Sequence, residues 1–109
     1  MAATTGVPLT IEPDAAARVA ELGMKAELER MLDHTRQVVP KLQHIRVTLI
    51  PPYDTGDEPY LTIEATRGGT YAGDDPTQRK WGDWVINTFP PDVWRHFGFF
   101  IIDGTTDAG

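Results

Sequence analysis

Residues 45–66 read IRVTLIPPYDTGDEPYLTIEAT, and this stretch decides the fold. Apolar and polar residues alternate at its start and again at its end, which is the pattern of two half-buried strands. The connection PPYDTGDEP between them is rich in proline, glycine and acid, which disfavour a continued strand ladder. An antiparallel hairpin that pairs Val47 with Ile63 also brings Arg46 opposite Glu64. One register therefore satisfies both faces of the hairpin.

A strongly helical segment, residues 10–39, precedes this hairpin. Pro13 suits a first helical turn, and apolar residues at helical spacing follow it. Gly23 interrupts the pattern at a cost of about 1 kcal/mol relative to alanine inside a helix, so we expect a kink or a break there. Pro40 ends the segment.

A second helix and a third strand follow the glycine-rich segment 67–75. Pro76 suits the first helical position, and Trp81 and Val85 lie on the apolar stripe of this helix. The run FGFFII, residues 97–102, is short, aromatic and β-branched, as a strand would be. The sequence therefore predicts an α+β fold: a small antiparallel-containing three-stranded sheet with helices on one face, in the order α-β-β-α-β.

Length and composition are those of one globular domain. With 109 residues, 40% of them apolar, we expect a single α+β domain over residues 10–102, a flexible N-terminal segment over 1–9 and a flexible C-terminal tail over 103–109. The absence of cysteine favours a reducing cytoplasm. We find no targeting pattern and no stretch apolar enough for a membrane, so we expect no membrane partner.

The charge argues against nucleic acid as a partner. The formal net charge is −6, and the lysines and arginines are scattered rather than gathered in a stripe. Mimicry of DNA by acidic residues stays a further possibility, although the chain lacks a dense acidic helix.

Few residues could carry chemistry. Serine and cysteine are both absent, which removes the two commonest nucleophiles. His34, His44 and His96 lack the spacing of metal ligands, and the acids of 54–58 do not follow a calcium-loop pattern. The glycines of 67–75 precede acids where a phosphate loop would need a lysine. We therefore expect no catalytic residue, no metal ion and no cofactor.

The order of these segments resembles that of small uncharacterised bacterial proteins, in which a helix leads to two alternating strands, a Trp-containing helix, a proline break and a last strand. The matching residues are 45–65, WGDWVINTFP at 81–90 and FGFFII at 97–102. The resemblance implies the same architecture. It implies no activity and no functional residue.

Seven of the ten aromatic residues lie within 81–100. They could form the core, or part of them could form an interface. Alternate residues of 97–102 project to opposite sides of a strand, whereas two helices cover only one face of a small sheet. We therefore expect an interface, covered by a second copy in a homodimer or by another protein, at Trp94, Phe97, Phe99, Phe100 and Ile102.

Two classes of function remain open. We favour a non-catalytic protein-binding or regulatory domain, such as an accessory or antitoxin-like partner. The alternative is a small-ligand-binding domain, or an enzyme without a covalent intermediate, with a pocket near the C-terminal aromatic residues. Its polar groups would come from Tyr53, Tyr71, Asp92, Arg95 and His96.

Overall fold

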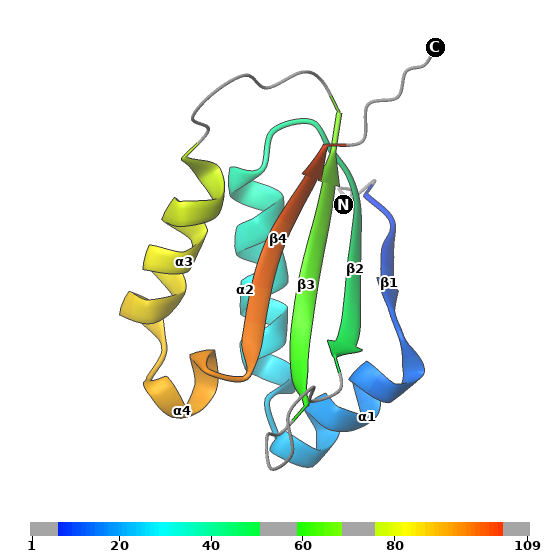
Figure 1. Ribbon diagram of the computed structural model, residues 1–109, viewed down its shortest axis with the longest axis vertical. Helices are drawn as coiled ribbons and strands as arrows, with labels where there is room; N and C mark the ends of the chain where they lie inside the picture. The colour runs from blue at the N-terminus through cyan, green and yellow to red at the C-terminus, as the bar shows by residue number, and fades with distance from the viewer. Residues whose placement is uncertain (1–6, 51–58, 69–75, 104–109) are drawn as a thin grey trace.

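The structure, a computed structural model, describes residues 7–50, 59–68 and 76–103 (Figure 1). Its elements are β1 (Leu9–Ile11), α1 (Pro13–Leu22), α2 (Lys25–Val38), β2 (Leu42–Ile50), β3 (Tyr60–Arg67), α3 (Thr77–Thr88), α4 (Pro91–Trp94) and β4 (Phe97–Asp103). The α+β class predicted from the sequence is confirmed.

The sheet differs from the expected one, because the described residues form four strands instead of three. The strands lie in the order β1-β2-β3-β4, with β1 parallel to β2, β2 antiparallel to β3 and β3 parallel to β4. The predicted order α-β-β-α-β is wrong at its beginning, where β1 precedes the first helix, and before its last strand, where α4 is inserted. The sheet thus consists of two parallel pairs joined by a hairpin, and β1 and β4 are its edges.

The additional strand is short. β1 has three residues, and the amide of Ile45 donates a hydrogen bond to the Pro8 carbonyl at 3.0 Å, so strand pairing begins before residue 10. Three residues carry no measurable alternation. The strand exists because its backbone pairs with β2, which lies far along the chain, and local sequence does not report such pairing.

The hairpin has the predicted register. Val47 lies opposite Ile63 and Leu49 opposite Leu61, while Arg46 faces Glu64 on the other side of the sheet. Alternation fixes this register because a slip of one residue would expose the whole apolar set.

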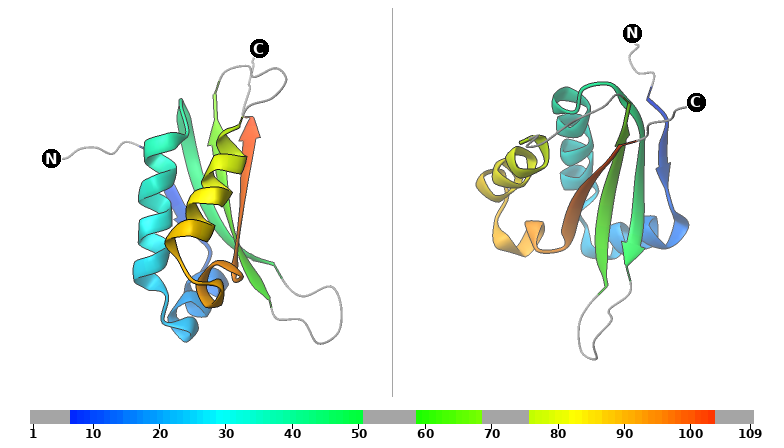
Figure 2. Two further views of the ribbon diagram at one scale, coloured as in Figure 1. Left: turned by 90° about the vertical axis from the view of Figure 1, so that its left-hand side faces the viewer. Right: turned by 45° about the horizontal axis from the view of Figure 1, so that its top comes forward.

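The helices cover one face of the sheet, as expected, and Figure 2 shows α2 and α3 side by side on that face. The break predicted at Gly23 is present: this residue has φ 68°, and its amide donates a hydrogen bond to the Ala20 carbonyl at 3.2 Å. Glycine adopts this left-handed conformation without the steric cost of a Cβ atom. The first helical segment is therefore two helices, α1 and α2.

The core lies between this face and the helices. Ile45, Val47, Leu61 and Ile63 from the central strands are fully buried there, and Met31 of α2 packs among them. These residues are the apolar half of the alternating pattern, so the same period that predicts the strands also predicts their buried side.

Several expectations concern residues that are not described. The hairpin connection 51–58, the segment 69–75 and most of both expected flexible ends lie outside the described residues. Among the described residues, no helix has the length and apolar character needed to cross a bilayer.

Candidate binding surface

β4 has a core side and an outer side, and the five expected interface residues divide between them or lie just before the strand. Phe99 belongs to the core, where its ring stacks on Trp81 with centroids 4.3 Å apart. Phe97 and Trp94 are partly buried and pack against the same core. Phe100 and Ile102 project from the opposite face and are exposed to 47% and 44%.

The outer face has no helix over it among the described residues (Figure 2). Phe100 leans over Gly98 from one side and Tyr60 leans over it from the other, since a Cβ atom at Gly98 would lie 4.0 Å and 3.6 Å from their ring carbons. Tyr60 is itself exposed. The glycine thus leaves a flat place in β4 that aromatic rings flank.

Away from β4 the outer face becomes polar. One row across the sheet runs Thr10, Arg46, Glu64, Phe100, so a cation and an anion lie side by side next to the exposed aromatic ring. In the next row Thr48 lies opposite Thr62, and the hydroxyl groups of both are buried without a hydrogen-bond partner among the described residues. Apolar exposure is therefore concentrated at the β4 edge.

Ile86 of α3 is a further exposed apolar residue, and it lies on the helix side of the sheet. It is exposed to 52%, more than any other large apolar residue described. Trp84 on the opposite flank of α3 stacks on His34 of α2, whereas the Gln78 side chain reaches β4. Since Ile86 is about 200° around the helix from Trp84, it lies on the flank of α3 that is turned away from α2.

We call Ile86, Phe100, Ile102 and the outer edge of β4 the β4 surface. Three of the six exposed large apolar residues in the described part of the chain belong to it. The sequence indicated Phe100 and Ile102 through strand alternation, but it missed Ile86. The signal for Ile86 was its place off the apolar stripe of α3, immediately after Val85, which is buried.

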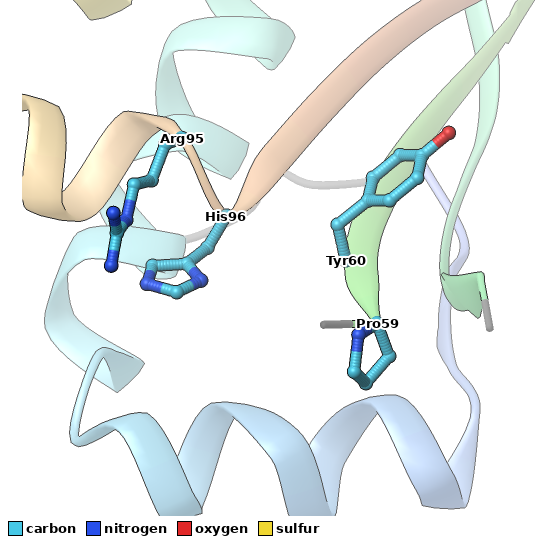
Figure 3. A pocket seen from close by; sticks show the side chains of 4 residues that line it. All are labelled: Pro59, Tyr60, Arg95 and His96. Carbon is cyan, nitrogen blue, oxygen red and sulfur yellow. The ribbon is translucent and has the colours of Figure 1, made fainter. Parts of the chain in front are cut away.

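A shallow hollow of about 210 Å³ lies beside α4, lined by Pro59, Tyr60, Arg95 and His96 (Figure 3). Arg95 and His96 are two of the polar residues expected for a ligand pocket. Their side chains extend away from the Tyr60 ring, whose hydroxyl points in the opposite direction. The polar groups do not converge on one point, as a binding site for a small ligand requires. Asp92 is exposed nearby on α4, and Tyr53 and Tyr71 lie outside the described residues.

The three histidines occupy separate places. His34 stacks on Trp84 between α2 and α3 with centroids 3.8 Å apart, and burial lowers its pKa. His44 on β2 lies 3.0 Å from the Thr10 hydroxyl, and His96 is buried at the start of β4. In the described ranges, no group of three or more histidine, aspartate or glutamate residues could hold a metal ion.

Trp81 is held in the core by a chain of hydrogen bonds. Its indole N–H donates to the Thr35 hydroxyl at 3.0 Å, and that hydroxyl donates to the Met31 carbonyl at 2.8 Å. The side chains of Trp81 and Thr35 are both buried. The aromatic residues of α3 therefore serve packing, and the exposed residues of the β4 surface remain as the candidate for binding.

No protein-family model matches this sequence, and searches among curated proteins and solved structures gave no significant match.

Proposed function

We propose that this chain is a non-catalytic protein-binding domain, an accessory or antitoxin-like partner, and that it binds through the β4 surface. The observation that carries the proposal is the exposure of Phe100 and Ile102 on a sheet face that none of the described helices covers. Each large apolar side chain left in water forgoes about 1.5–3 kcal/mol relative to full burial. A partner that covers both residues recovers part of this free energy.

The composition of the surface supports a protein as the partner. Aromatic and aliphatic side chains form its centre, and the pair Arg46 and Glu64 lies beside it, which is the arrangement of an apolar interface core with a polar rim. The net charge of −6 argues against nucleic acid. A cytoplasmic location belongs to the same proposal, since the sequence contains no cysteine.

The alternative function is a small-ligand-binding domain with its site in the hollow beside α4. The geometry supports it less, because that hollow is shallow and the polar groups of Tyr60 and His96 point apart. An apolar cleft with convergent polar groups is the usual form of such sites. We therefore favour the protein-binding function.

The test is site-specific photocrosslinking in the cells that produce the protein. A photoreactive phenylalanine analogue replaces Phe100 in one variant and Leu9, which is exposed on the opposite edge, in the control. We expect one protein adduct from position 100 and none from position 9. Unlabelled wild-type protein should compete for this adduct, whereas the Phe100→Asp variant should not. No adduct from position 100, or equal adducts from both positions, contradicts the proposed function.

A further inference from the structure

A hollow of about 280 Å³ lies in the corner where β1, α1 and α2 meet. Ile11 at the end of β1 lines it, together with Val19 of α1 and Leu28 of α2, which are both buried. The turn at Gly23 joins the two helices, and Figure 1 shows α1 lying across the end of the sheet where β1 ends. The hollow therefore belongs to the β1 edge of the sheet, which is the edge opposite to the β4 surface.

Two alanines leave this corner unfilled. Ala16 and Ala20 are four residues apart on α1, so they share one face of this helix, and both line the hollow. Both are also exposed to solvent. A longer side chain at either position would occupy part of the hollow.

Lys25 brings a positive charge to this apolar hollow. It is the only charged residue among the described residues that line it. Lys25 also lines an adjoining hollow of about 320 Å³, which shares Ile11 and Leu28 with the first, so its side chain lies where the two hollows meet. Within the described ranges Lys25 forms no ion pair. An unpaired ammonium group thus lies beside an apolar hollow.

We propose that this hollow binds a small anionic amphiphile, a carboxylate on an unbranched apolar chain. The chain displaces water from Ile11, Val19 and Leu28, while the carboxylate lies against the Lys25 ammonium group. Ligand sites usually have about 300–1,000 Å³, so this ligand is a small one. At about 30 Å³ for each group of the size of a water molecule, the hollow has room for roughly eight to ten carbons. This site is separate from the proposed function, because it lies on the other edge of the sheet.

Charge selects an anionic head group and its position. The net charge of −6 repels an anion from most of the surface, so an unpaired cation marks the place where it can bind. In the adjoining hollow, Glu29 and Asp33 line the wall, and the second cation there, Arg36, is paired with Asp33 at 2.8 Å. These carboxylates keep the head group at Lys25. The apolar chain then extends into the hollow beside α1.

Titration of the full chain with octanoate, followed by NMR of methyl groups, tests the site. We expect the methyl signals of Ile11, Val19 and Leu28 to shift and to saturate, while those of Ile86 and Ile102 on the β4 surface stay unchanged. Hexanoate should bind about 15-fold more weakly, because each buried methylene group changes the affinity about fourfold. Shifts without saturation, or equal shifts on the β4 surface, overturn the proposal. Signals that shift with protein concentration alone identify a second copy as the occupant, which also overturns it.

A substitution on α1 tests whether the hollow itself is the site. Ala20→Leu should weaken octanoate binding about tenfold or more, because the leucine side chain takes the place of roughly two methylene groups of the ligand. Ala17→Leu is the matched control, since Ala17 is exposed on α1 and is not among the residues that line the hollow. Equal effects of the two substitutions contradict binding in the hollow.

Removal of the lysine charge tests the head group. Lys25→Gln should weaken octanoate binding about two- to fivefold, the effect of an exposed ion pair, and should leave the binding of uncharged octanol unchanged. Lys80→Gln, a matched substitution of an exposed lysine on α3, should change neither affinity. An unchanged octanoate affinity in the Lys25→Gln variant, or an equal loss for octanoate and octanol, overturns the proposal of an anionic ligand.

Discussion

The indole ring of Trp81 lies flat against the ring of Phe99, with an interplanar angle of 6°, and this contact separates the core side of β4 from its outer side. Phe99 is buried beneath α3, whereas its neighbour Phe100 is half exposed. Two adjacent phenylalanines therefore have opposite roles, and the stability of the fold should distinguish them.

Phe99→Ala should lower the free energy of unfolding by about 3–5 kcal/mol, because it leaves a cavity against Trp81. Phe100→Ala, measured at low protein concentration, should lower it by no more than about 1 kcal/mol. Urea denaturation of both variants gives the comparison. Similar losses at the two positions would show that Phe100 is also part of a packed core.

A pair of threonine substitutions should act in opposite directions. Thr35→Val removes the acceptor of the Trp81 indole N–H in the core, and leaving this buried donor unpaired costs about 1–3 kcal/mol of stability. Thr62→Val should instead stabilise the fold by about 1 kcal/mol, because the Thr62 hydroxyl is buried with no partner among the described residues. Thermal or urea unfolding measures both, and a destabilised Thr62→Val variant would refute the assignment of that hydroxyl as unsatisfied.

The stacking of His34 on Trp84 should make stability depend on pH. Burial lowers the pKa of His34 in the folded state, so the unfolded chain binds this proton more readily. Stability is therefore complete above the ordinary histidine pKa of about 6.5 and decreases as pH falls from there through the folded-state pKa.

His34→Phe serves as the control for this effect, because it keeps an aromatic ring against Trp84 and removes the titrating group. The difference in stability between wild type and His34→Phe should change between about pH 8 and 5, in the direction that favours the variant in acid. A constant difference over this range contradicts a lowered pKa for His34.

The sequence alone predicted those strands in which apolar and polar residues alternate. The hairpin register followed from the two faces of β2 and β3, and the division of β4 into two sides followed from the same period. β1 and α4 were missed because three or four residues cannot show a period, and β1 owes its existence to pairing with β2. The interface prediction included Phe97 and Phe99 because the sequence does not show which face the helices cover.

Ile86 shows why part of the candidate surface could not be predicted from the sequence. Its neighbour Val85 is buried and Trp84 packs on α2, so its exposure depends on the rotation of α3 about its axis. That rotation is fixed by contacts with α2 and β4, which lie far away in sequence. A surface composed of one helix flank and one strand edge becomes visible only when the fold brings them together.

Sedimentation of the purified chain tests the central claim most directly. Over roughly 1–500 μM, a range suited to weak dimers, the mass of the wild type should rise from 12.1 kDa toward twice that value. Phe100→Asp should remain near the mass of one chain, and Leu9→Asp, the matched substitution on the opposite edge, should behave as the wild type does. A wild-type chain that stays at 12.1 kDa throughout, or a Phe100→Asp variant that associates as the wild type does, would contradict self-association through the β4 surface.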